Sequence, residues 1–360
     1  MKNINKEFYS GEKKEKAKEE LNEEGVEKEE IISRRDFMKK TLSGAGVLLA
    51  APFVGKIEAA LGQSGKKEIS DLERGMFKEQ DPEKIIDRLN YIIEKIGPFA
   101  YKQLGCLPAD IYDLNNRPEA KRKLIENLNQ KPEVKKDIKK PVAMDSLKQI
   151  GLEPKLVQEF LKTLPESWRK EVALITYLDK PTEVMANEIT GEKDKLVAHH
   201  QSKGKEAQSE IYFFPGAKEK RPVEDLFPFL IYECAHANNW RNRADLSFGQ
   251  RISLLYEVIK RVESSDRFKY EMIEKISYKE KKREIAKKAI EYWAAISLYS
   301  IMCVEHTKKN PHTQPPVTDI KLVHDYLKMT DPDFDILKMA KKRIGFLKRV
   351  QAEREAVKSS

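Results

Sequence analysis

The chain has 360 residues and a net charge of +9, from 68 lysines and arginines against 59 aspartates and glutamates. At about 150 residues per domain this length predicts roughly two domains. The 16 glycines and 17 prolines are too few for a collagen-like or low-complexity protein. No uncharged apolar run reaches the ~18 residues of a membrane-spanning helix, which excludes a multi-span membrane protein. Three cysteines cannot build a disulfide framework.

The first 80 residues differ in composition from the rest of the chain. Residues 1–32 mix lysine, glutamate and asparagine with few apolar side chains, so they cannot bury enough surface to fold, and we expect a disordered charged tail. Residues 33–60 begin with SRRDFMK and continue into TLSGAGVLLAAPFVG, the longest stretch without a charge. Residues 61–80 are polar and contain glycine and serine, which predicts a linker.

Residues 33–60 have the parts of an export signal: a basic start, a short apolar stretch and small residues after it. The pair Arg34 and Arg35, inside SRRDFMK, resembles a twin-arginine translocation signal. The resemblance implies that the twin-arginine export machinery carries the folded protein across the cytoplasmic membrane. The protein is then expected in the periplasm, outside the cell, or anchored by an uncleaved signal, since the residues before Ala59 and Ala60 match the cleavage rule poorly.

The remaining sequence predicts a mostly helical α+β protein. Residues 81–170 form a helical lead-in region, where apolar residues from Ile85 to Ile96 recur at helical spacing until Gly97-Pro98. Strand-like runs occur only between Glu171 and Phe214, and helical patterns follow almost to the end. Strands followed by helices favour an α+β domain over alternating βαβ units. The three expected strands are 172–177, 195–198 and 211–214.

The segment LFPFLIYECAHANNWRNR, residues 226–243, contains the most informative pattern. On a helix, Tyr232 and His236 are four residues apart and share a face, with Glu233 beside them. This arrangement resembles the His-Glu-x-x-His helix of the zincin metallopeptidases, in which two histidines bind zinc and the glutamate activates water. The second histidine and the glutamate are present, and a tyrosine stands at the first histidine position.

Two neighbouring segments extend the resemblance to the gluzincin branch of the zincins. Glu291 lies about 55 residues after the motif, in a Glu-aromatic-aromatic-Ala pattern on an apolar helix, where gluzincins carry their third zinc ligand. The resemblance implies that residues 171–360 form a zincin-like domain with a small mixed sheet. Glu233 would be the general base, and His236, Glu291 and the residue at position 232 would hold Zn2+. Zincins bind an extended peptide along an edge strand before the motif, a role that falls here to Ile211, Tyr212 and Phe213.

Tyr232 is the main departure from the family pattern. A phenol has a pKa near 10 and must lose its proton to bind zinc at pH 7, which disfavours metal binding. A replacement ligand would have to come from His199-His200 or from Glu305-His306 and His312. Two functions therefore remain open: a zinc peptidase that hydrolyses peptide bonds, or an inactive zincin-fold protein that binds extended peptides or cell-envelope polymers.

Three other interpretations fit the residues less well. A metzincin would carry a histidine where Asn242 stands, and a di-iron bundle would need a second Glu-x-x-His, which the chain lacks. Nucleic-acid binding is not expected, because the basic residues alternate with acidic ones and no recognition motif accompanies them. The mixed-sign helix faces suit solubility and attraction to an anionic envelope surface.

Overall fold

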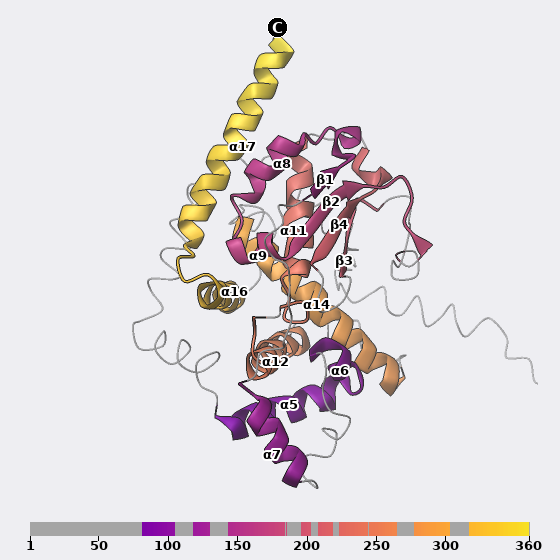
Figure 1. Cartoon of the computed structure of the whole chain (residues 1–360), viewed down its shortest axis with the longest axis vertical. Coiled ribbons are helices and arrows are strands. Elements are labelled where there is room, and N and C mark those ends of the chain that lie inside the picture. The colour runs from indigo at the N-terminus through magenta and orange to yellow at the C-terminus, as the bar shows by residue number, and fades with distance from the viewer. Residues whose placement is uncertain are drawn as a thin grey trace, which may run out of the picture. The chain divides into compact units, whose positions relative to one another are not determined.

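The computed structural model describes residues 81–104, 118–129, 143–183, 185, 196–202, 208–218, 223–243, 245–264, 277–302 and 317–359 (Figure 1). These residues belong to one compact unit of the chain. The predicted tail, the signal with Arg34 and Arg35, and the linker lie outside the described residues. No helix within the described ranges combines the length and apolarity needed to cross a membrane.

The predicted helical lead-in begins with α5 (Pro82–Ile96), whose ends are set by its own sequence. Asp81 caps the first turn by accepting a hydrogen bond from the backbone N–H of Glu83 at 3.1 Å. Gly97 ends the helix with φ +53°, a conformation that favours glycine, and donates its N–H to the carbonyl of Ile93. Most of the predicted apolar stripe is buried, and only Ile93 is half-buried. The buried residues are Ile85, Ile86, Leu89, Ile92 and Ile96.

Short helices continue this region. They are α6 (Phe99–Leu104), α7 (Pro118–Asn127), α8 (Pro154–Leu161) and α9 (Glu166–Lys170). Helices α8 and α9 lie between two parallel strands along the chain, so the fold contains one βαβ connection that the sequence did not predict. Short 3-10 helices occur at Leu147–Ile150, Pro215–Lys218 and Val223–Leu226.

A small mixed sheet of four strands confirms the α+β prediction. Its strands are β1 (Ala143–Asp145), β2 (Val172–Tyr177), β3 (Ala198–Ser202) and β4 (Ser209–Phe213). The order is β1-β2-β4-β3, with β1, β2 and β4 parallel and β3 antiparallel to β4. Among the described strands, β1 and β3 lie at the two edges of the sheet, so β3 is the outer strand on its side.

The strand predictions were right for β2 and less accurate elsewhere. The strand expected at 211–214 corresponds to β4, and the one expected at 195–198 lies further along, at β3. Strand β1 was missed because it has only three residues and lies inside the region predicted to be helical. Such a short strand has no alternating pattern of its own and forms only because β2 pairs with it.

The second half of the described chain is helical, as predicted. It contains α11 (Phe227–Ala237), α12 (Phe248–Ser264), α14 (Tyr278–Met302), α16 (Val317–Thr330) and α17 (Ile336–Ser359). Helix α11 is buried on every side because it packs against α14 as well as against β3 and β4 (Figure 1). Helix α14 also contacts α12, α5 and α16, so it connects the motif helix with the N-terminal and C-terminal helices.

Candidate functional site

Tyr232 and His236 lie one turn apart on α11 and contact each other. Their ring centroids are 4.7 Å apart and the ring planes meet at 83°, an edge-to-face arrangement. Tyr232 is 4% exposed and His236 is 7% exposed. Because every residue of α11 is buried, packing on all sides fixes these two rings, and the shared helical face predicted from their spacing is confirmed.

Glu291 reaches the same place from α14. The hydroxyl of Tyr232 donates a hydrogen bond to Oε2 of Glu291, and Nε2 of His236 lies 3.9 Å from the same oxygen. The Glu291 side chain is 39% exposed, whereas the His236 side chain is only 8% exposed. The three side chains therefore form one cluster, named here the Tyr-His-Glu cluster, which opens to solvent at Glu291.

His200 on β3 adds a second imidazole beside this cluster. The His200 and His236 ring centroids are 6.2 Å apart, and the rings are within 12° of parallel. His200 pairs with Ile211 across the β3–β4 ladder, and neighbouring side chains on a strand point to opposite faces. His199 therefore points away from α11. The sequence had offered these histidines and His306 and His312 equally, and the last two lie outside the described residues.

Glu233 occupies a different environment from Glu291. It is 1% exposed, inside the fold rather than on the solvent-open side of the cluster. Burial raises the pKa of the neighbouring Cys234 thiol, and the charge of Glu233 adds to that effect. A thiol with a raised pKa is a poor nucleophile, so Cys234 serves as a small buried apolar side chain.

The predicted peptide-binding strand needs correction. Ile211, Tyr212 and Phe213 belong to β4, which is hydrogen-bonded to β2 on one side and β3 on the other. Its backbone groups are already used, so β4 cannot pair with a peptide. The continuous apolar run at 211–214 is in fact typical of an interior strand with both faces covered. The outer strand beside α11 is β3.

The donor groups of the cluster do not fit a zinc ion well. Zinc sites use thiolates, imidazoles and carboxylates that have lost their protons, but the Tyr232 hydroxyl donates a hydrogen bond to Glu291. Within the described part of the chain, no three or more His, Cys, Asp or Glu side chains are arranged to hold a metal ion. The arrangement instead favours a hydrogen-bonded cluster that is complete without a metal.

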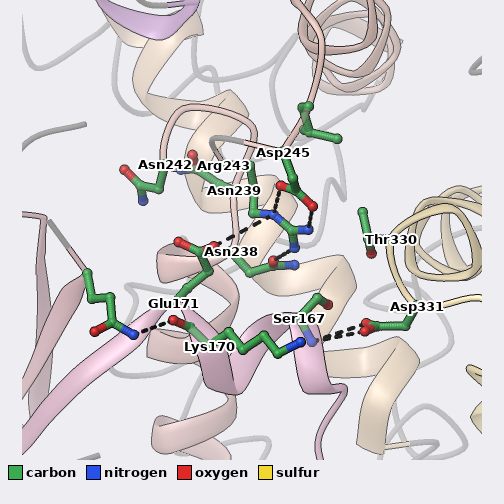
Figure 2. Close-up of polar contacts among 12 residues, drawn as sticks. Ser167, Lys170, Glu171, Asn238, Asn239, Asn242, Arg243, Asp245, Thr330 and Asp331 are labelled. Atoms are coloured by element: carbon green, nitrogen blue, oxygen red, sulfur yellow. Dashed lines mark hydrogen bonds and ion pairs between the residues drawn. The ribbon is translucent and has the colours of Figure 1, made fainter. Parts of the chain in front are cut away.

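A buried polar network holds the end of α11 that carries His236 (Figure 2). Arg243, 2% exposed, bonds Asp245 and Asn238, and its Nε lies 3.9 Å from the buried carboxylate of Glu171. Asn242 donates from Nδ2 to the carbonyl of His236 at 2.9 Å. The sequence predicted no such network, and Asn242 entered there only as the counterpart of a metzincin ligand. The sequence feature that could have indicated this network is the polar run NNWRNR directly after an apolar helix.

The network also reaches the C-terminal helices. The hydroxyl of Tyr326, on α16, donates to the carbonyl of Asn238 at 3.2 Å. The Tyr326 ring stands edge-on to Trp293 of α14, with centroids 5.1 Å apart. Burial raises the pKa of Tyr326, so the phenol remains protonated and able to donate. Helix α16 thus helps fix the turn that follows the motif helix.

No protein-family model, curated protein or solved structure matches this chain.

Proposed function

We propose that this chain is an exported, zincin-like protein that binds an extended peptide without hydrolysing it. The observation that supports this most directly is the hydrogen bond from Tyr232 to Glu291. It joins the two positions that would both hold the metal in an active relative. A site whose ligands bond to each other has no need of an ion to satisfy them.

The length of the tyrosine side chain strengthens this argument. A phenol oxygen lies further from its backbone than a histidine Nε2 does, by roughly the length of a zinc–nitrogen bond. A tyrosine at position 232 therefore places its oxygen near the point where an ion bound to a histidine would be. Tyr232 is only 4% exposed, and its hydroxyl takes the place of both the first ligand and the ion.

Strand β3 is the proposed peptide-binding edge. It is the outer strand of the sheet, runs antiparallel to β4, and packs against α11. An extended peptide can add to an outer strand by main-chain hydrogen bonds, with side-chain pockets giving specificity. His200 points from β3 toward the cluster, so a peptide along β3 would pass beside the solvent-open carboxylate of Glu291.

Measuring the zinc content of the purified protein tests the proposal that the site holds no metal. The full-length chain, purified and incubated with excess zinc, is expected to hold less than about 0.1 equivalent after gel filtration. The Tyr232→His variant is expected to gain zinc affinity at least tenfold, because it frees Glu291 and adds an imidazole. Tyr91→His is the matched control, since Tyr91 also donates to a glutamate, Glu263, but lies away from α11.

Stoichiometric zinc in the unaltered chain would contradict the proposal and support a second function. In that alternative the protein is a zinc peptidase with His200 in place of the missing histidine, beside His236 and Glu291, and Glu233 as general base. His200 is favoured as the substitute because its ring centroid lies 6.2 Å from that of His236. Loss of zinc in His200→Ala would identify it, while retention of zinc would exclude it.

Peptide binding is tested separately with a tryptic digest of casein as the probe. The full-length chain should retain a subset of the peptides, and their masses should be unchanged after prolonged incubation. Amide exchange at 198–202 should slow in the presence of the retained peptides, because new main-chain hydrogen bonds protect an outer strand. Exchange at 351–359 in α17 should stay the same. Truncated peptides, or retention without protection at β3, would count against this function.

A further inference from the structure

A groove between α8 and α17 lies apart from the Tyr-His-Glu cluster and from β3. Its volume is about 490 Å³. It is lined by Lys162 and Thr163, which directly follow α8, and by Lys342, Gly345 and Arg349 of α17. Phe346 and Glu159 complete the lining. This volume is within the range of small-molecule sites, but the groove is shallow and open to solvent, so a ligand there would be held mainly by charge.

The floor of the groove is firmly packed. Phe346 is 5% exposed, and its ring lies 5.6 Å from that of Phe160 and 5.3 Å from that of Phe227, measured between centroids. Phe160 and Phe227 are themselves stacked at 4.2 Å. Above this floor, a Cβ added at Gly345 would meet no atom within 4 Å. The missing side chain at Gly345 therefore leaves room for a ligand beside the backbone of α17.

The groove carries a net positive charge. Its lining has three cations, Lys162, Lys342 and Arg349, and one carboxylate, Glu159. Arg349 pairs with Glu159 at 2.5 Å and, outside the lining, with Glu353 at 3.8 Å. Lys162 and Lys342 form no ion pair within the described ranges. The surrounding stretch of α17, residues 336–351, has no acidic residue and six basic ones: Lys338, Lys341, Lys342, Arg343, Lys348 and Arg349. Most charged segments of this chain mix both signs, so this stretch is distinct.

We propose that the groove binds a terminal phosphate monoester. Arg349 is shared between two carboxylates, Glu159 and Glu353, so the charge available to a ligand comes from Lys162 and Lys342. Two lysines match the charge of about −1.5 to −2 that a phosphate monoester carries at pH 7. Lysine ammonium groups bind phosphate oxygens as point charges, and Arg349 can share its guanidinium between Glu159 and the ligand. The organic part of the ligand would lie over Gly345, where space is free.

Two sources could present this group, and the test separates them. Glycerol 3-phosphate represents a soluble ester, and phosphatidylcholine vesicles containing phosphatidic acid represent a lipid headgroup. Calorimetry of the full-length chain with glycerol 3-phosphate, and cosedimentation with the vesicles, should show binding by at least one of them. That binding should weaken as salt concentration rises, because exposed charges are screened. Binding of neither probe would overturn the proposal.

Three variants locate the binding. The double variant Lys162→Gln/Lys342→Gln should weaken it at least tenfold by removing both unpaired charges. Gly345→Leu should weaken it similarly by filling the free space, and leucine is a better helix former than glycine, so loss of folding would not explain the result. Lys348→Gln, on the same helix but outside the groove, should bind as the unaltered chain does. Equal weakening by Lys348→Gln would show diffuse attraction to α17 and overturn the proposal.

Discussion

At the scale of single residues, the bond between Tyr232 and Glu291 joins a buried phenol to a carboxylate that solvent reaches. Tyr232 is 4% exposed, while the Glu291 side chain is 39% exposed. Water can therefore replace the phenol as a donor to Glu291, but nothing outside the protein can replace Glu291 for Tyr232. The hydrogen bond is expected to contribute modestly to stability and strongly to the chemistry of the cluster.

Tyr232→Phe should lower the free energy of unfolding by about 1 kcal/mol, because it removes one hydrogen bond to a charged group that water partly restores. Urea unfolding followed by tryptophan fluorescence measures the change. Tyr256→Phe is the control: its hydroxyl has no hydrogen-bond partner in the part of the chain that the structure describes, so its change should stay below about 0.5 kcal/mol. Equal losses in both variants would contradict the assigned bond.

Arg243→Met should be far more costly, by about 3–5 kcal/mol, because it leaves Glu171 buried without its compensating charge. The same urea assay measures it. Arg122→Met, which removes ion pairs of a 70% exposed arginine on α7, should change stability by less than about 0.5 kcal/mol. A loss at Arg243 as small as that at Arg122 would show that the network of Figure 2 does not hold the motif helix in place.

At the scale of elements, two helical glycines illustrate how packing between helices overrides local propensity. Gly249 lies in the first turn of α12, which packs against α5, and Gly345 lies in the middle of α17. Sequence alone treats both as weak points of a helix. A Cβ at Gly249 would lie 3.0 Å from Cδ1 of Ile85 and 3.3 Å from the carbonyl oxygen of Leu128, while one at Gly345 meets nothing within 4 Å.

Gly249→Ala is therefore expected to destabilise the protein by about 1–2 kcal/mol, since the crowding outweighs the gain in helix propensity. Gly345→Ala should stabilise it by up to about 1 kcal/mol, because only the propensity changes. Thermal unfolding of the two variants side by side gives the comparison. The packing assigned to α12 would be wrong if both substitutions raised stability alike.

At the scale of the whole molecule, the C-terminal helices complete the core rather than form an appendage. Val323, Tyr326 and Leu327 of α16 are buried, and Arg343 of α17 donates to the carbonyl of Ile301 near the end of α14. Asp331, between these two helices, accepts hydrogen bonds from the N–H of Ser167 at 3.1 and 3.3 Å. Contacts of this kind join parts of the chain that are far apart in sequence.

A chain ending at residue 316 should fail to fold cooperatively, because it exposes the core around Trp293 that Tyr326 covers. Loss of near-UV circular dichroism and binding of a hydrophobic dye would report this. A chain ending at Val350 should lose less than about 1 kcal/mol, since residues 351–357 are largely exposed and Arg354–Glu224 is a partly exposed ion pair. Cooperative unfolding of the chain that ends at residue 316 would contradict the role given to α16.

The sequence by itself determined the helical lead-in, strand β2, the long helical second half and the shared helical face of Tyr232 and His236. These features depend on local spacing: the apolar stripe of α5, the run at 172–177, and the four-residue step from Tyr232 to His236. Such patterns follow from the periods of the helix and the strand, which neighbours in the chain already define.

Only the tertiary structure decided which strand is the outer one, which histidine joins the cluster, and what Tyr232 does there. The order of strands depends on pairing between distant segments, and an apolar run such as 211–214 has the same appearance whether its edge is free or paired. His200 was one of several histidines until β3 was placed beside α11. The bond between Tyr232 and Glu291 depends on the approach of α14 to α11, which no local pattern encodes.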